Sequence, residues 1–324
     1  MNARSIAPGL LFALALGLAS VLVGQWISLS GLLIAILVGM VIGNVLKLPA
    51  SFAPGTKVAS KTVLRWGIVL LGLQLSLGDI ASLGGWMIFV VIAVVAIGMF
   101  ATYWIGRALK IGKGTSILMA SGFSICGAAA VAAAADVSDS DEEDTATALG
   151  MVVLFGTLMI PIVPLLGRLM GLDDATTGLW AGASVHEVAQ VVAIGGSVSE
   201  EALKGAVIVK LTRVLMLAPV MFVLTWLTRQ AHKGSDAKLP PLVQWFVAGF
   251  LLAVVVRSLG FLPEAVLDVA KFIQTLLLAS AMFALGLGVQ ASIFKRVGAK
   301  PLVLGVISTT IIAIVGLAGV MLAS

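Results

Sequence analysis

The chain has 324 residues, of which 60% are hydrophobic and 11% are charged. Soluble domains are about 45–50% apolar and about 25% charged, so this composition excludes a soluble globular protein and indicates a chain surrounded mostly by lipid. The net charge of +5 is more typical of the cytoplasmic loops of a membrane protein than of a nucleic-acid-binding face, and we expect no nucleic-acid partner. One cysteine and two histidines are too few for a disulfide framework or a structural zinc site, and we expect no metal and no cofactor.

The sequence predicts an all-α polytopic membrane protein with about eleven transmembrane helices, because a crossing needs about 20 predominantly apolar residues. The predicted spans lie at residues 8–24, 30–46, 64–78, 86–106, 115–135, 146–166, 176–195, 206–227, 242–259, 266–290 and 301–323. The first span could instead be a cleaved signal peptide, since Arg4 precedes its apolar run. We favour a membrane span, because residues 25–30 form a short turn into the second span.

The basic residues predict the orientation, since Lys and Arg concentrate in cytoplasmic loops. A cytoplasmic N-terminus and an external C-terminus place most of them inside, including the segments 107–113 and 229–238. The acidic run from Asp136 to Asp144 then becomes an outer loop. We interpret this run as a solvated loop in preference to a metal-collecting site, because blocks of like charge repel one another and hydrate.

Two weak internal matches suggest an inverted repeat, the arrangement of many transporters. One match relates residues 38–73 to residues 248–287, and the other relates residues 116–121 to residues 275–280. The two registers exclude each other. We favour a single transmembrane domain, residues 1–324, in which residues 1–29 form an extra helix and the halves are residues 30–166 and 174–324.

Glycine and serine interrupt two of the predicted spans in mid-membrane, at Ser121–Gly127 and at Gly182–Glu187. Glycine followed by serine is typical of a helix start, so we expect discontinuous helices with half-helix N-termini near Ser124 and Ser184. Such an N-terminus carries about half a positive charge and can hold an anion at the bilayer centre. Close helix packing through small residues is the alternative, and for residues 115–135 the two interpretations are equally supported.

Ionisable residues inside apolar spans predict a functional centre. His186, Glu187 and Gln190 lie in one span, and Lys210 and Arg213 lie on one face of the next. An ionised group at the bilayer centre costs about 2.5–3.5 kcal/mol, so we expect these groups to face one polar interior, with Glu187 paired to Lys210 or Arg213. A buried ion pair that only locks the two spans together is the alternative.

Enzyme classes fit this centre poorly, and we expect no enzyme. The stretch His186–Gln190 has the start of an HExxH zinc motif, but the second histidine is replaced by Gln190. An intramembrane serine hydrolase would need Ser184 or Ser124 activated by His186, and nothing in the sequence supplies an oxyanion hole. A channel would need a continuous polar pore, whereas the polar residues cluster in a single belt.

The motifs Ser124–Gly127, Ser184–Gln190 and Lys210–Val214 resemble the YeiH family of bacterial inner-membrane proteins, which are often labelled sulfate exporters. The resemblance covers nearly the whole chain and implies a secondary transporter in the bacterial inner membrane. It also implies an architecture similar to bile-acid symporters and sodium/proton antiporters, with crossed discontinuous helices. The sulfate label implies an inorganic or sulfonated anion as substrate.

The sequence therefore predicts a secondary transporter of a small anion that works by alternating access, in lipid, as a monomer or a homo-oligomer. The predicted substrate-binding residues are Ser124, Ile125, Cys126, Gly127, Ser184, Lys210 and Arg213. The predicted ion-coupling residues are His186, Glu187 and Gln190. The alternative is a transporter of another organic solute that is coupled to Na⁺ or H⁺.

Overall fold

The computed structural model describes residues 3–27, 30–46, 48–231, 241, 243–289 and 298–323, and all regular structure in these ranges is helical. Within these ranges, six helical stretches are long and apolar enough to cross a membrane, which confirms a helical membrane protein: Ser5–Trp26, Gly84–Ala108, Glu142–Leu169, Glu200–Ala231, Glu264–Gly288 and Lys300–Met321. Three apolar helices are shorter: Gly31–Val45, Val188–Val198 and Trp245–Ser258.

The chain forms two compact units, and each is discontinuous in sequence. The first unit comprises residues 1–76 and 249–296, and the second comprises residues 77–248 and 297–324. Neither unit coincides with a predicted half, because the first unit combines segments from both ends of the chain.

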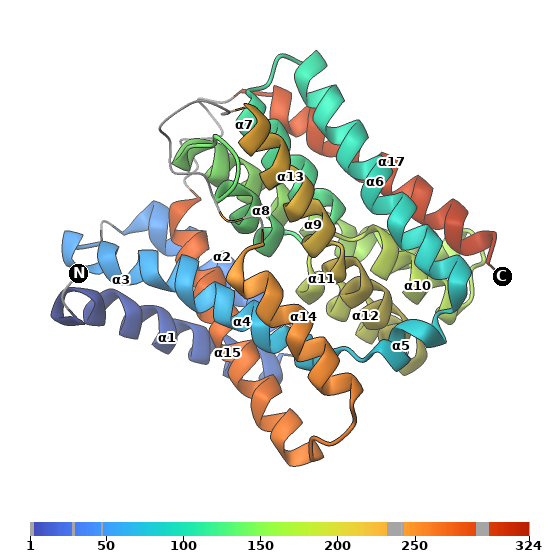
Figure 1. Ribbon diagram of the computed structural model, residues 1–324, viewed down its shortest axis with the longest axis horizontal. Coiled ribbons are helices and arrows are strands. Elements are labelled where there is room, and N and C mark those ends of the chain that lie inside the picture. The colour runs from blue at the N-terminus through green and yellow to red at the C-terminus, as the bar shows by residue number, and fades with distance from the viewer. Residues whose placement is uncertain are drawn as a thin grey trace. The chain divides into compact units, whose positions relative to one another are not determined.

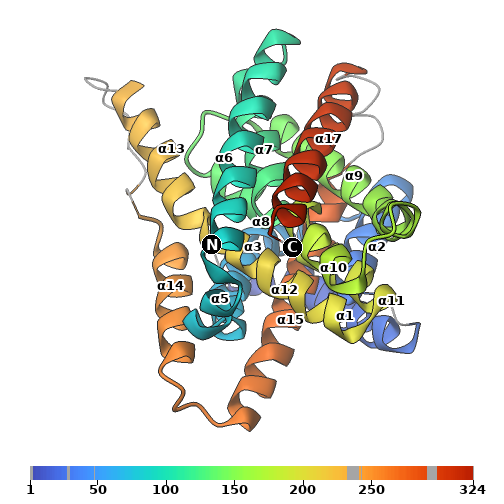
Figure 2. The ribbon, with the colours of Figure 1, turned by 90° about the vertical axis from the view of Figure 1, so that its right-hand side faces the viewer.

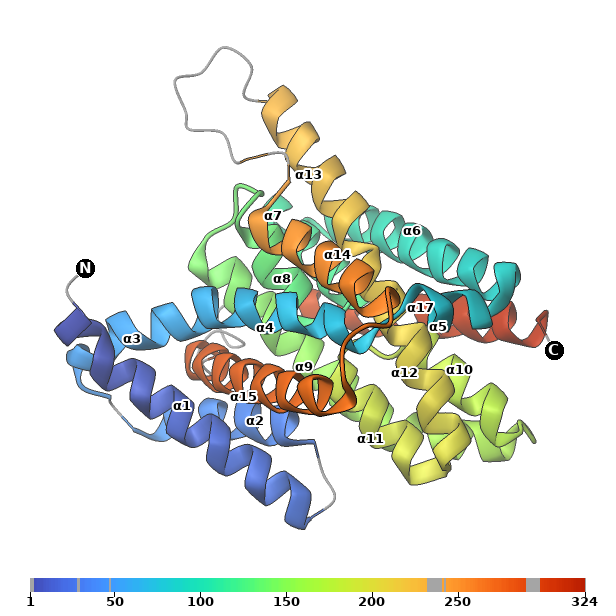
Figure 3. The ribbon, with the colours of Figure 1, turned by 60° about the horizontal axis from the view of Figure 1, so that its bottom comes forward.

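The first unit is held together by small residues at helix crossings. Its helices are α1 (Ala3–Trp26), α2 (Gly31–Val45), α3 (Ala53–Val58), α4 (Leu64–Leu71), the later part of α14 (Trp245–Ser258), and α15 (Glu264–Gly288). Gly17 of α1 packs directly against Ser280 of α15, and Gly39 of α2 packs against the α15 backbone near Gly286. Figure 3 shows α1 and α2 alongside α15. Glycine at these positions lets the backbones approach closely, as in other membrane helix pairs.

The second unit contains the predicted discontinuous helices. Its helices are α5 (Leu77–Ser82), α6 (Gly84–Ala108), α7 (Lys113–Ser124), α8 (Ala128–Ala135), α9 (Glu142–Leu169), α10 (Asp174–Ser184), α11 (Val188–Val198), α12 (Glu200–Leu215), α13 (Leu217–Ala231) and α17 (Lys300–Met321). Helices α6 and α17 run side by side (Figure 1). They are antiparallel, because Gly98 packs against Ile312 whereas Gly106, further along α6, packs against Leu304.

Helices α7 and α8 form a hairpin. Gly122 near the end of α7 packs against Val131 of α8, and Gly114 near the start of α7 packs against Ser140, beyond the end of α8. The chain therefore turns back at residues 125–127. The helix is discontinuous as predicted, but the expectation that residues 115–135 cross from one side to the other is wrong.

The hairpin also changes the placement of the acidic run. The Thr115 hydroxyl donates a hydrogen bond to the Asp144 carboxylate at the start of α9. Residues 136–144 thus lie at the same end of the second unit as the basic segment 107–113. The predicted placement of these two segments on opposite sides of the membrane is wrong, because the apolar stretch between them enters and returns.

Helices α10 and α11 form a second hairpin, which turns back at residues 185–187. Gly178 of α10 and Gly195 of α11 both pack against Ala202 near the start of α12, so the outer ends of the hairpin meet there. The grouping of α10, α11 and α12 is visible in Figure 2. Residues 176–195 are therefore a hairpin as well, and not the crossing that the sequence predicted.

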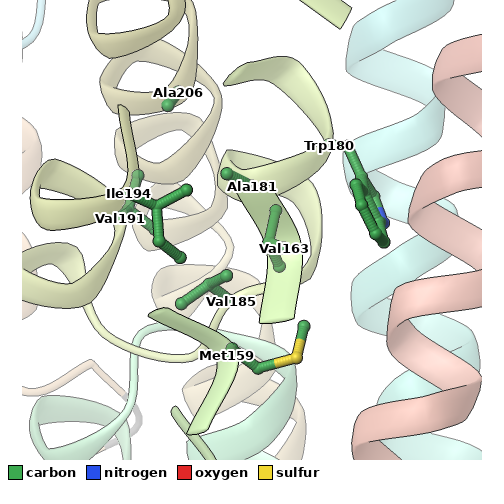
Figure 4. Close-up of a cluster of buried hydrophobic side chains, with 8 residues drawn as sticks. All are labelled: Met159, Val163, Trp180, Ala181, Val185, Val191, Ile194 and Ala206. Carbon is green, nitrogen blue, oxygen red and sulfur yellow. The ribbon is translucent and has the colours of Figure 1, made fainter. Parts of the chain in front are cut away.

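An apolar cluster packs the second hairpin against its neighbours (Figure 4). Its side chains come from α9, the two arms and tip of the hairpin, and α12: Met159, Val163, Trp180, Ala181, Val185, Val191, Ile194 and Ala206. Burial of these side chains positions the end of each arm, and with it the polar residues at the turn.

Candidate functional site

The two hairpins meet at their turns, which we name tip 1 (Ile125, Cys126 and Gly127) and tip 2 (Val185, His186 and Glu187). Gly127 has φ +80° and ψ −130°, a conformation that residues with a side chain rarely adopt. Each tip joins the C-terminal end of one helix to the N-terminal end of another. Four helix ends therefore expose backbone carbonyl and N–H groups that have no partner within their own helix.

Arg213 of α12 binds the C-terminal ends of both α7 and α10. Its Nη2 donates to the carbonyls of Ser124 (2.7 Å) and Phe123 (3.0 Å), and its Nε also donates to Ser124 (3.2 Å). Its Nη1 donates to the carbonyls of Ala183 (2.8 Å) and Val185 (3.0 Å). The guanidinium is fully buried, and its fork of donors joins the two hairpins.

Lys210 joins the same two tips one turn earlier on α12. Its Nζ donates to the carbonyl of Ile125 (2.8 Å) in tip 1 and to the carbonyl of Val185 (2.7 Å) in tip 2. Both cations thus lie at the negative ends of helix dipoles, where a positive charge is stabilised. Two of the three Lys210 donors are used by these carbonyls.

Glu187 joins the tips at the positive helix ends. Its carboxylate accepts a hydrogen bond from the backbone N–H of Ala128, the first residue of α8. Glu187 is also the residue that precedes α11, and its own N–H donates to Gln190 Oε1 (3.0 Å). Gly156 of α9 leaves the space that the Gln190 amide occupies.

His186 is fully buried and uses both ring nitrogens. Nδ1 lies 3.1 Å from the Phe123 carbonyl in the neighbouring hairpin, and Nε2 lies 3.0 Å from the Thr309 hydroxyl of α17. A carbonyl only accepts, so Nδ1 carries a proton, and in the neutral ring Nε2 accepts from Thr309. Thr309 was not predicted from the sequence, where a hydroxyl in an apolar span gives no distinctive signal.

The structure brings the predicted residues together with different partners from those expected. The expected ion pair of Glu187 with Lys210 or Arg213 is wrong. The Glu187 carboxylate binds a backbone N–H of the first hairpin, and Lys210 and Arg213 bind backbone carbonyls of both hairpins. The physical reason is that broken helices expose unpaired backbone donors and acceptors. The carbonyls at these helix ends accept hydrogen bonds from the two cations, and an N–H group donates to the carboxylate.

The two serines occupy helix ends opposite to those predicted. Ser124 and Ser184 are the last residues of α7 and α10, and neither begins a half-helix. The Ser184 hydroxyl donates to the Trp180 carbonyl (2.6 Å) of its own helix. Gly127 and Glu187 precede the half-helices instead, because three non-helical residues reverse the chain before the next helix begins.

The fold and this centre define a class: an all-helical membrane protein in which the turns of two helical hairpins meet around buried cations and a carboxylate. The chain belongs to the family described as conserved hypothetical protein 698, whose model matches residues 8–305. This family comprises the UPF0324 membrane proteins and is the YeiH family, so the resemblance drawn from the motifs is confirmed.

Three relatives illustrate the match. A UPF0324 membrane protein of Corynebacterium glutamicum is 47% identical over 98% of this chain and 93% of its own length. A UPF0324 membrane protein of Pseudomonas aeruginosa is 39% identical over 93% of this chain and 90% of its own length. One of Bacillus cereus is 38% identical over 88% of this chain and 84% of its own length. No solved structure matches this chain.

Proposed function

We propose that this protein is a secondary transporter of a small anion, working by alternating access. The observation that supports this function best is the meeting of two hairpin tips around buried ionisable residues. Non-helical backbone and charge at membrane depth are costly and are tolerated where they form a substrate or ion site. Discontinuous helices whose ends face the bilayer centre are a recurrent substrate site in secondary transporters.

The proposed topology has nine crossings, a cytoplasmic N-terminus and an external C-terminus. The crossings are α1, α2, the helix from α3 through α4, α6, α9, α12 with α13, α14, α15 and α17. The hairpin α7–α8 then enters from the inside and α10–α11 from the outside. Fourteen Lys and Arg residues fall on the inner side and four on the outer side, with Lys210 and Arg213 between them.

Opposed hairpins are what an inverted repeat would produce. Of the two registers found in the sequence, the match of residues 38–73 with 248–287 fits the structure better. It relates α2 and α4 to α14 and α15, four helices of the first unit. We propose this register, in which the second repeat is circularly permuted relative to the first.

The charges at the tips favour an anion. Two positive and two negative helix ends meet there and offset one another. Lys210 and Arg213 carry two positive formal charges against one negative charge on Glu187, with His186 neutral. One positive charge therefore remains, or two when Glu187 is protonated. A monoanion suits the first state, and a dianion such as sulfate or another sulfur oxyanion or sulfonate suits the second.

The N-terminal ends of α8 and α11 are the proposed anion subsite. Glu187 is 9% exposed, whereas His186, Gln190, Lys210 and Arg213 are at most 1% exposed, so Glu187 is the most accessible of these five residues. Lys210 and Arg213 act mainly by holding the tips, and Lys210 keeps a third donor for the substrate. The backbones of tip 1 and of Ser124 and Ser184 shape the subsite.

Glu187 is the proposed coupling residue, with His186 and Gln190 positioning it. Its carboxylate already occupies the N-terminal end of α8 as an intramolecular anion. Protonation would remove this charge and free the Ala128 N–H for the substrate. Proton binding and anion binding would thus be linked, which is the thermodynamic requirement for coupled transport.

The alternative function is a Na⁺-coupled or H⁺-coupled transporter of a different organic solute. The Glu187 carboxylate supports it, since a carboxylate with backbone carbonyls is also a cation site. A Na⁺ gradient that drives uptake of a carboxylate solute without any effect of sulfate would favour this alternative.

The experiment is anion uptake into proteoliposomes with the purified full-length protein. We expect uptake of labelled sulfate, sulfite or a sulfonate that responds to a pH gradient, and we expect Glu187→Gln to remove this response. Glu201→Gln, at an exposed position on α12, is the matched control and should leave uptake unchanged. Absence of uptake of every anion at every pH would refute the function. An unchanged pH response in Glu187→Gln would refute the coupling role alone.

A further inference from the structure

Three buried hydroxyl groups near the tips have no hydrogen-bond partner. Thr102 of α6 and Ser124 of α7 are fully buried, and Ser308 of α17 is 1% exposed. Their oxygen atoms make no hydrogen bond within the described part of the protein. Buried polar groups are almost always hydrogen-bonded, so such groups point to a partner such as ordered water.

Thr147 and Thr157 of α9 also lack a partner within the described residues. Several other helical hydroxyls in the second unit behave differently. They donate to the carbonyl four residues earlier in their own helix, the usual solution for Ser and Thr in apolar helices. This group includes Ser116, Ser121, Ser184, Thr212 and Thr225. Thr102, Ser124 and Ser308 depart from this pattern, so their side chains are oriented toward something other than their own backbone.

The helix registers place Thr102 and Ser308 opposite each other. Gly98 packs against Ile312, and Gly106 packs against Leu304. Thr102 lies midway between the two glycines, and Ser308 lies midway between their partners. The two hydroxyls therefore face the same layer of the α6–α17 seam.

Helix α7 borders the same layer. Gly98 also packs against the Ser124 hydroxyl, and Gly106 against the Ser116 hydroxyl. This register sets Ala120 of α7 level with Thr102. A methyl group offers no hydrogen bond, so α7 supplies no partner for the Thr102 hydroxyl.

The seam leads to the tips. Ser308 is followed by Thr309, whose hydroxyl is the partner of His186 Nε2. In the opposite direction, Thr102 is six residues from the end of α6 at Ala108, about 9 Å along the axis. Hydroxyl groups thus extend from His186 toward the inner end of the second unit.

We propose that ordered water binds in the α6–α7–α17 seam between Thr102 and Ser308 and forms a proton route from the inner end to His186. The route rests on the proposed function: it would bring a proton to His186, the residue of tip 2 that precedes the proposed coupling residue Glu187. A proton enters when the Thr309 hydroxyl gives its hydrogen to His186 Nε2 and takes another from the water. The reverse transfer returns the proton.

The charged groups around this route come from other elements. Arg213 and Lys210 of α12 lie at the tip end, with Glu187 and Cys126 in the tips themselves. Arg107, Lys113 and Lys300 lie at the helix ends, and Asp144 lies beside Thr115. Between these two levels the facing positions of α6, α7 and α17 carry no titratable side chain, so hydroxyls and water are the only groups there that can pass a proton.

The test uses Thr102→Val and Ser308→Ala in the full-length protein, with Ser121→Ala as the matched control. Ser121 is a fully buried hydroxyl of α7 that is already bonded to its own helix. We expect uptake driven by a pH gradient to fall about tenfold in the two seam variants, because they interrupt proton transfer. Anion exchange at equal pH should persist, since it needs no net proton movement. Unchanged driven uptake, or an equal loss of exchange, would overturn the route.

Thermal unfolding provides a second measurement that does not depend on transport. A water-filled seam predicts that each seam variant lowers the midpoint more than Ser121→Ala, because each removes a partner of bound water. A dry seam predicts a higher midpoint, because each variant removes a buried hydroxyl that has no partner. Absence of uptake in the wild-type protein would refute the transporter function, and unfolding would still decide whether water occupies the seam.

Discussion

The two hairpins of the second unit have the same architecture but differ in chemistry. Each has a helix that ends in serine, a three-residue tip and a returning helix. The first hairpin contributes backbone carbonyls, the N–H of Ala128 and the glycine of tip 1. The second hairpin also contributes carbonyls, but it adds the side chains of His186 and Glu187, and both of these side chains bind the backbone of the first hairpin.

This difference shows how a polar centre can be built with few charges. The first hairpin supplies shape, because its tip must expose backbone groups in a fixed geometry. The second hairpin supplies ionisable side chains that bind these backbone groups. Lys210 and Arg213 of α12 hold the two hairpins together. Changes in the first hairpin should therefore act through conformation, and changes in the second should act through contacts.

The largest effect should follow from removing the group shared by both hairpins. Arg213→Leu leaves the buried carbonyls of Ser124 and Ala183, at two helix ends, without their donor, and we expect a loss of roughly 3–5 kcal/mol of stability. Such a variant should accumulate poorly in membranes. Arg168→Leu, at an exposed position of α9, is the control. Equal expression and thermal stability of the two variants would contradict the fastening role.

The shape of tip 1 is tested by Gly127→Ala. Alanine at this position would have to adopt a positive φ, and its methyl group would collide with the Glu187 side chain. We therefore expect the free energy of unfolding to fall by about 3 kcal/mol. Gly171→Ala is the matched control, since Gly171 also has a positive φ (+69°) but open space around it. We expect about 1 kcal/mol there. Similar unfolding midpoints for the two variants would show that Glu187 does not constrain tip 1.

The contacts of tip 2 are tested by Gly156→Ala. A methyl group on α9 would displace the Gln190 amide from the Glu187 N–H, at a cost of about 1–3 kcal/mol. Adding Gln190→Ala should recover part of this loss in thermal unfolding, because the collision disappears. Gly85→Ala, a helical position with no neighbours, should be neutral or slightly stabilising. If the double variant unfolds at the same midpoint as Gly156→Ala alone, the loss of stability does not come from a collision with Gln190.

The smallest effect concerns the starts of the two hairpins. Asp173 caps α10 by accepting from the Thr176 N–H (2.7 Å), whereas Gly112 before α7 has no side-chain cap. The hydrogen bond from the Thr176 N–H lowers the pKa of Asp173 in the folded protein. The carboxylate therefore stabilises the folded state at pH values above the pKa that Asp173 has in the unfolded chain. This contribution is lost as the pH falls through the lower pKa that Asp173 has in the folded protein. Asp173→Ala should lower the unfolding midpoint slightly at neutral pH and not in acid. A deficit that is independent of pH would contradict this reading.

Composition and local motifs predicted the helical membrane class and the positions of both helix interruptions. The prediction of crossings at residues 115–135 and 176–195 failed for a physical reason. Twenty apolar residues satisfy hydropathy whether they continue or turn back, and the turn depends on Gly122 and Gly178 packing against distant helices. The acidic run was misplaced for the same reason.

The candidate site was predicted in composition but not in pairing. Intramembrane charge identified Glu187, Lys210 and Arg213 as a group. Their partners could not be predicted, because backbone carbonyls and N–H groups are present at every position and become available only where a helix ends. Thr309 and the seam hydroxyls were missed because serine and threonine in apolar helices usually bond to their own backbone.

Cys126 gives this protein an internal reporter. It is the single cysteine of the chain, it lies in tip 1, and it is buried, with 3% of its surface exposed. If the tips separate during the proposed transport cycle, a thiol reagent should reach this residue, so its alkylation rate tests that opening without any engineered cysteine. The fold thereby allows the population of open molecules to be followed in native membranes.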